Sequence, residues 1–164
     1  MRIRQALPSD IAAVDQLMKA AAEGVSPMIF CRDEQDYLAA HVHGQGFILL
    51  AEEEGLAGML LVRFPQLAED HLGWDLGWPP KRLLQACHME SLAVHPRYRG
   101  RGLQRQLLQA AEERMGERCG ECLATVAPEN AVSLRNFLQM GYTVVAQVRK
   151  YGGYDRYILW KRRT

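Results

Sequence analysis

The sequence has no long hydrophobic run and no excess of charge of one sign. Its longest apolar stretches, such as residues 47–51 and 58–62, are much shorter than the roughly 20 residues that a membrane-spanning helix requires. Twenty lysines and arginines against 19 aspartates and glutamates give a net charge of +1, so no overall field attracts nucleic acid or an anionic membrane. We therefore expect no nucleic-acid partner and no membrane partner, and any basic site must be local.

Cysteine is also scarce, and the N-terminus lacks an apolar segment of signal-peptide length. Four cysteines in 164 residues are too few for a disulfide framework, and the start MRIRQALPSD has no small-residue cleavage site. We expect a cytoplasmic protein with reduced thiols. Cys119 and Cys122 form a CxxC pair, which could be a redox pair or half of a metal site. No second CxxC or HxxxH accompanies the pair, so we expect no metal.

The chain length and hydrophobic content fit one domain, residues 1–164, of α/β (α+β) structure. At 48% hydrophobic, the 164 residues can form a substantial core. Apolar periodicity and turn signals predict the order β-α-α-β-β-β-α-β-α-β-β. The predicted strands are 3–6, 47–52, 56–64, 88–94, 122–127, 142–150 and 154–161, and the predicted helices are 11–22, 32–42, 103–115 and 130–140. Residues 66–84, which contain several glycines and prolines, are predicted to form a long loop.

The most informative segment is a glycine-rich turn between a predicted strand and a predicted helix. Residues 97–102 read RYRGRG and stand directly before the helix start. Free backbone N–H groups and the positive end of the helix dipole attract anions there, and glycines let phosphate oxygens approach the main chain. Arg97, Arg99, Arg101 and Arg105 add local positive charge. These features favour a small diphosphate, although an ordinary strand-to-helix connection can have the same pattern.

Other readings of this turn fit less well. The dinucleotide motif GxGxxG fails because Arg105 occupies the third glycine position, and no GK[ST] follows for a nucleoside triphosphate loop. A nucleic-acid contact is a further alternative for the arginine cluster. The balanced charge of the chain and the few aromatic residues near the cluster argue against it.

The turn resembles a known family signature. RYRGRG matches the pattern [QR]xxGx[GA] of the GNAT superfamily of N-acetyltransferases, with Arg97, Gly100 and Gly102 at the defining positions. MESLAVHP resembles that family's fourth strand, and NAVSLRNFLQMGY resembles its later helix. The resemblance implies a mixed, mostly antiparallel twisted sheet of about seven strands with helices on both faces. It also implies transfer of the acetyl group of acetyl-CoA to a primary amine by direct attack in a ternary complex.

The resemblance further implies which residues bind acetyl-CoA. The backbone of Leu92, Ala93 and Val94 would pair with the pantetheine arm like an added strand. The pyrophosphate would lie on the turn and helix start, which comprise Arg99, Gly100, Arg101, Gly102, Leu103, Gln104 and Arg105. Asn130 would hydrogen-bond the pantetheine arm near the sulfur, or cap the helix that it starts, or do both.

Acetyl transfer to an amine requires a group that removes a proton, because an aliphatic ammonium has a pKa of about 10.4. His88 and Glu90 lie two residues apart on a predicted strand and therefore on one face of the sheet. We predict Glu90 as the first candidate for the base and His88 as the second; the alternative is that both are solvated polar side chains at a strand edge. Many members of the family have a tyrosine that can protonate the leaving thiolate where this chain has Phe137. The alternative function is accordingly a non-catalytic module that binds or senses acyl-CoA.

The acceptor is expected to be an amine of a small molecule or a peptide. Residues 66–84 contain Glu69, Asp70, Trp74, Asp75 and Trp78, and carboxylates with indole faces suit a cationic amine. The alternative is that the tryptophans pack in the core or at a subunit interface. A homodimer formed through the last strands is as consistent with the sequence as a monomer.

Overall fold

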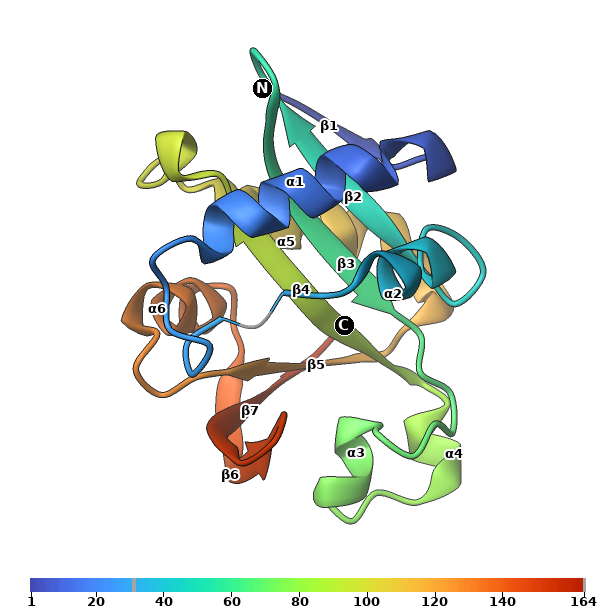
Figure 1. Cartoon of the computed structure of the whole chain (residues 1–164). Coiled ribbons are helices and arrows are strands. Elements are labelled where there is room, and N and C mark those ends of the chain that lie inside the picture. Colours follow the sequence, from blue (N-terminus) through green and yellow to red (C-terminus); the bar gives the residue numbers. More distant parts are fainter. Residues whose placement is uncertain (31, 164) are drawn as a thin grey trace.

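A seven-stranded sheet forms the centre of the computed structural model, which describes residues 1–30 and 32–163 (Figure 1). The strand order is β1-β2-β3-β4-β5-β7-β6. The strands are β1 (Arg2–Gln5), β2 (Gly46–Glu52), β3 (Leu56–Arg63), β4 (Ala86–Val94), β5 (Glu121–Val126), β6 (Thr143–Lys150) and β7 (Tyr154–Arg162). All neighbouring pairs are antiparallel except β4 and β5, which are parallel. The predicted mixed, mostly antiparallel sheet is confirmed.

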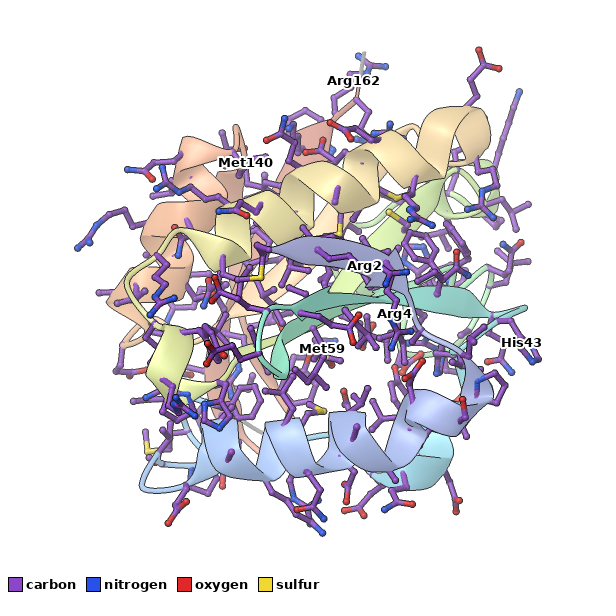
Figure 2. The ribbon with its side chains drawn as sticks, turned by 90° about the horizontal axis from the view of Figure 1, so that it is seen from above. Arg2, Arg4, His43, Met59, Met140 and Arg162 are labelled. Atoms are coloured by element: carbon purple, nitrogen blue, oxygen red, sulfur yellow. The ribbon has the colours of Figure 1, made fainter. Side chains whose placement is uncertain are left out.

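Helices cover both faces of this sheet. The four longer ones are α1 (Ile11–Ala22), α2 (Gln35–Ala40), α5 (Leu103–Met115) and α6 (Ala131–Gln139). Figure 2 shows the sheet between α1 and α5. Short 3-10 helices, η1 (Pro8–Asp10), η2 (Pro96–Tyr98) and η3 (Gly116–Arg118), adjoin α1 and α5. No helix among the described residues is both long and apolar enough to cross a bilayer.

Each face of the sheet has its own apolar core because successive strand residues point to opposite sides. On β2, Phe47 and Leu49 pack toward α5, whereas Ile48 and Leu50 pack toward α1. The helices contribute side chains at spacings of three and four residues, as expected for one buried stripe. These are Val14, Leu17, Met18 and Ala21 from α1 and Leu103, Leu107, Leu108, Ala111 and Met115 from α5.

Residues 66–84 correct the prediction of a long irregular loop. They contain α3 (Leu72–Asp75) and α4 (Pro80–Leu83), each about one turn long. Gly77, with a φ of +72°, lies between them. Pro80 begins α4, a position where its missing N–H costs no helical hydrogen bond. The glycines and prolines therefore delimit short helices here instead of preventing them.

The parallel strands β4 and β5 run side by side for a short distance only. Their register joins Ala86 to Glu121, Cys87 to Cys122 and His88 to Leu123. Beyond these pairs β4 stays paired with β3, and β5 stays paired with β7. Figure 1 shows the two strands diverging toward the side where α6 lies. Among the described residues, the edge of β4 that faces β5 therefore has no strand partner after His88.

Candidate functional site

A cleft of about 710 Å³ lies along the open edge of β4. Every predicted cofactor-binding residue except Arg101 lines it: Leu92, Ala93, Val94, Arg99, Gly100, Gly102, Leu103, Gln104, Arg105 and Asn130. The side chain of Arg101 instead donates from Nη1 to Glu53 Oε2 at 3.2 Å. The fold thus brings a strand edge, a glycine turn and two helix starts to one cavity.

Gly100 and Gly102 give the turn its shape. Their φ angles are +80° and +73°, a region that only glycine adopts without strain. Gly102 is the N-cap residue of α5, and no side chain caps this helix end. The first N–H groups of α5 therefore lack helical partners and lie at the cleft. Together with the guanidinium of Arg105, they form a region that can bind an anion.

Asn130 caps α6, as one of its two predicted roles requires. Its Oδ1 accepts the backbone N–H of Ser133 at 3.2 Å. The residue also lines the cleft. Asn136 Nδ2 donates to Gln104 Oε1 at 3.1 Å, which ties α6 to α5 across the same cavity. Contact between Asn130 and a pantetheine arm stays a prediction.

A smaller pocket of about 260 Å³ adjoins the cleft, and the two share Leu92, Asn130 and Ser133 among their lining residues. Its charged and hydroxyl-bearing lining consists of Arg32, Asp33, Glu90, Ser91, Thr125, Ser133, Tyr151 and Arg156. These side chains come from the segment before α2, from β4, from β5, from α6 and from the β6–β7 hairpin. A molecule held along β4 would therefore end beside a polar pocket.

The predicted pair His88 and Glu90 lies together, with Glu90 at this pocket. The His88 side chain is 3% exposed and that of Glu90 is 16% exposed. The backbone N–H of Leu72 donates to His88 Nε2 at 3.3 Å, so in the neutral ring the proton is on Nδ1, which donates to Glu90 Oε2 at 3.2 Å. Both ring nitrogens of His88 are thus engaged, and Glu90 is the member of the pair that lines the pocket.

Glu90 is a carboxylate at neutral pH. Burial raises the pKa of Glu90, but hydrogen bonds from His88 and Tyr37 and the positive charge of Arg63 outweigh burial, so the pKa lies below its usual value. Arg63 Nη1 lies 4.0 Å from Glu90 Oε2. The Arg63 guanidinium also makes a two-pronged contact with Asp70 at 2.8 and 3.0 Å.

Asp33 is a second carboxylate at the pocket and was not among the predicted site residues. The sequence pattern placed it in the first turn of a helix over residues 32–42, but α2 begins at Gln35. Asp33 Oδ2 accepts a hydrogen bond from Ser91 Oγ. Burial raises the pKa of Asp33 to about 6, and the nearby charge of Glu90 adds to this effect, while the hydrogen bond from Ser91 opposes it. No local sequence signal distinguishes this aspartate from a helix-start residue.

Phe137 lines the same pocket, and its ring cannot donate a proton. It packs edge-on against Tyr142 with the ring centroids 5.0 Å apart. The Tyr142 hydroxyl is buried without a hydrogen-bond partner among the described residues. Burial, together with the neighbouring thiols Cys122 and Cys87, raises the pKa of Tyr142 well above its usual value. Tyr142 does not line the pocket, so its hydroxyl is not placed as a proton donor there.

Side chains of residues 66–84 line neither cavity. Part of this segment instead contacts His88. The His71 ring contacts that of His88 edge-on at 4.8 Å. His71 Nδ1 accepts the Gly73 N–H at 2.9 Å, and Nε2 donates to the Leu83 carbonyl at 3.0 Å. Burial lowers the pKa of His71 to about 4, which keeps the ring neutral.

The two tryptophans of this segment differ in their surroundings. Trp78 is buried, with the Arg82 guanidinium 3.8 Å above its ring. Trp74 is exposed, and its Nε1 donates to the Ala68 carbonyl at 2.9 Å. Asp75 pairs with Lys150 at 2.5 Å. Core packing, the alternative considered for the tryptophans, is what the structure shows for Trp78.

Three buried cysteines form the group of side chains best suited to hold a metal in the described part of the chain. The sulfur atoms of Cys87, Cys119 and Cys122 all lie within 4.8 Å of one another. Cys87 Sγ lies 3.6 Å from Cys122 Sγ and 3.3 Å from the thioether of Met115. Structural zinc sites take four cysteine or histidine ligands, and this group has three. The expectation that the protein holds no metal stays a prediction.

Comparisons with known proteins agree with this arrangement. The family model described as "Acetyltransferase (GNAT) family" matches residues 12–142. Similar solved structures include the ribosomal-protein-alanine N-acetyltransferase from Brucella melitensis, with a TM-score of 0.74 and 19% identity over 99% of this chain and 100% of that chain. Arabidopsis thaliana NAA60 in complex with acetyl-CoA has a TM-score of 0.75 and 16% identity over 98% of this chain and 97% of that chain.

A third similar structure is yncA from Salmonella typhimurium, a putative acetyltransferase with its cofactor acetyl-CoA. It has a TM-score of 0.70 and 22% identity over 99% of this chain and 93% of that chain. At these identities the structures show a shared fold. No curated protein sequence matches the chain.

Proposed function

The chain belongs to the Acetyltransferase (GNAT) family, and on this premise we propose that it transfers the acetyl group of acetyl-CoA to a primary amine by direct attack in a ternary complex. The separation of β4 from β5 carries the proposal, because it opens a strand edge between the glycine turn and the pocket of Glu90. The similar structures of NAA60 and yncA with acetyl-CoA support this choice of cosubstrate.

The cleft has the chemistry that coenzyme A requires. The main chain of Leu92, Ala93 and Val94 would pair with the pantetheine amides, as a peptide adds a strand to a sheet edge. The N–H groups of the α5 start and the positive charge of Arg105 would hold the pyrophosphate. Asn130 would lie beside the arm where the cleft meets the smaller pocket.

Bound acetyl-CoA supplies the electrophilic thioester carbon. Glu90, as a carboxylate, would hold the acceptor ammonium and take up the proton that the nitrogen must lose. His88 would act through Glu90, because its Nδ1 proton orients that carboxylate. The freed nitrogen forms a bond to the acetyl carbon, the bond from carbon to sulfur breaks, and the second proton that the nitrogen loses converts the released thiolate to the free thiol of coenzyme A. Phe137 cannot protonate the thiolate, but a thiol with a pKa of about 8.5 is an adequate leaving group without an acid.

Amine-dependent release of coenzyme A tests the proposal. Purified protein is incubated with acetyl-CoA and a panel of primary amines, and the free thiol is measured over time. We expect release that depends on both the protein and an amine. If calorimetry shows that the protein binds acetyl-CoA but none of the amines leads to thiol release, the result would instead support the sensing module. Phe137, at a position where many family members have a tyrosine, favours that alternative.

A further inference from the structure

Two charged groups of opposite sign line the pocket beside Glu90 without an ionic partner among the described residues. One is Arg156 and the other is Asp33. The remaining charged groups there have a partner of opposite charge: Arg32 lies 3.1 Å from Asp15, and Glu90 lies 4.0 Å from Arg63. The pocket therefore presents one positive and one negative side chain that have no ionic partner among the described residues.

Arg156 is the more unusual of the two because it is deeply buried. The residue is 4% exposed, and an arginine keeps its charge in any protein environment. Its hydrogen bond runs from Nη1 to the carbonyl of Asp155 at 2.8 Å. The rings of Tyr151 and Tyr154 lie 5.4 and 5.6 Å from the guanidinium carbon. Burying a cation without an anion is costly, and the remaining N–H groups of this guanidinium are available to a ligand.

Strand register explains why Arg156 lies at the same pocket as Glu90. Thr125 of β5 is opposite Ile158 of β7, and Arg156 lies two residues before Ile158, on the same face of the sheet. Leu123, two residues before Thr125, is opposite His88, which lies two residues before Glu90. These pairings place Arg156 and His88 on one face, and Glu90, which lies at the irregularity of β4 between Met89 and Ser91, is hydrogen-bonded to His88.

Tyr151 also lines the pocket, and its hydroxyl is hydrogen-bonded to Thr125 Oγ1 at 2.9 Å. No ion pair joins Arg156 to Asp33 or to Glu90 among the described residues, and all three side chains line one cavity of about 260 Å³.

We propose that the acceptor is a small zwitterionic amine, such as a free amino acid, whose carboxylate is bound by Arg156 while its ammonium lies between Asp33 and Glu90. This inference rests on the proposed acetyl transfer and names its substrate class. A guanidinium suits a carboxylate because two parallel N–H groups can contact its two oxygens. The pocket volume of about 260 Å³ lies just below the roughly 300–1,000 Å³ of pockets for drug-sized ligands and fits a small acceptor.

Matched acceptors test the role of the carboxylate. Free amino acids, their carboxamides and the corresponding decarboxylated amines are compared as acceptors for the wild type. We expect kcat/KM to be about 10- to 100-fold higher for the free acids, the range of one charge-assisted contact. Equal values for acids, amides and amines would overturn the proposal while leaving acetyl transfer intact.

Substitutions of Arg156 test whether the preference for free acids depends on this side chain. Arg156→Met should lose the preference without losing affinity for acetyl-CoA, and its melting temperature should not fall, because an apolar side chain of similar length avoids burying a charge. Arg156→Lys should keep part of the preference. Arg149→Met is the matched control, since the Arg149 side chain is 79% exposed on the same hairpin. A full preference for the acids in Arg156→Met would also overturn the proposal.

A binding measurement tests the acceptor class independently of the acetyl-transfer reaction. Calorimetry measures the affinity of the protein for the amino acids and for their amides, with and without coenzyme A. Selective binding of the acids, lost in Arg156→Met, would support the acceptor class even if no amine were acetylated, in which case only the proposed reaction would fail. Absence of acid-selective binding would reject the acceptor class whatever the turnover.

Discussion

The Nδ1 atom of His88 lies 3.2 Å from Oε2 of Glu90, and this contact links the pocket to the helices behind it. The ring of His88 is fixed on its other side by the backbone N–H of Leu72 and by the edge of His71. The segment of α3 and α4 thus fixes the position of the His88 ring, and His88 in turn orients the carboxylate of Glu90. Residues 66–84 can therefore influence the reaction without lining the pocket.

Replacing Glu90 by glutamine should lower kcat by about 10²- to 10⁴-fold, the usual contribution of a general base. Glutamine keeps the size of the side chain but cannot take up a proton. Affinity for acetyl-CoA, measured by calorimetry, should stay unchanged because Glu90 lines the smaller pocket and not the cleft. Full activity of Glu90→Gln would remove Glu90 as the base.

Replacing His88 by asparagine should change the pH profile more than it changes binding. The interaction with His88 lowers the pKa of Glu90. Its loss should therefore move the acidic limb of kcat/KM to higher pH, because Glu90 would then become protonated at a higher pH than in the wild type. An acidic limb at the wild-type position, with reduced kcat alone, would argue against positioning through Glu90.

The glycine turn can be tested with two glycines of nearly equal φ angle. Gly102 and Gly77 have φ angles of +73° and +72°, so valine should cost a similar roughly 1–2 kcal/mol of strain at each. Gly102→Val should weaken acetyl-CoA binding by at least about tenfold, because the new side chain would enter the cleft beside Arg105. Gly77→Val should keep wild-type affinity. Equal affinities in the two variants would contradict the assigned pyrophosphate site.

Asp33 should make stability depend on pH in a defined window. Its pKa is raised from 3.8 to about 6 by burial, with Glu90, His41 and the Ser91 hydroxyl as neighbours. Folding therefore favours the protonated form, and this stabilisation is lost as the pH rises from about 4 through about 6. Asp33→Asn should gain about 1–2 kcal/mol over the wild type at pH 7.5, after allowance for solvent screening, and little at pH 4. Urea unfolding at both pH values measures the difference.

Purified protein should contain no stoichiometric zinc, because Cys87, Cys119 and Cys122 supply three thiol ligands where structural zinc takes four. Elemental analysis of protein prepared without chelators measures the content. As a check on any metal that is found, Cys122→Ala removes one ligand from the group. One metal per chain in the wild type, lost in this variant, would contradict the expectation.

The sequence by itself determined the features that depend on neighbours within a few residues. The helix Leu103–Met115 has the predicted bounds, since the glycine turn before it and its regular apolar stripe are both visible in consecutive residues. Asn130 was predicted as an N-cap on the same local grounds. The glycine turn and the family signature likewise occupy a few consecutive residues, which is why the mixed sheet could be expected from the sequence.

Only the tertiary structure decided which distant residues share a cavity. Asp33 precedes α2 and Arg156 lies on β7, and both line the pocket of Glu90, which forms where β4 diverges from β5 and β5 pairs with β7. Cys87 joins the CxxC pair through the parallel pairing of β4 with β5. Local propensity contains no information on such contacts, because they are fixed by packing between segments far apart in the chain.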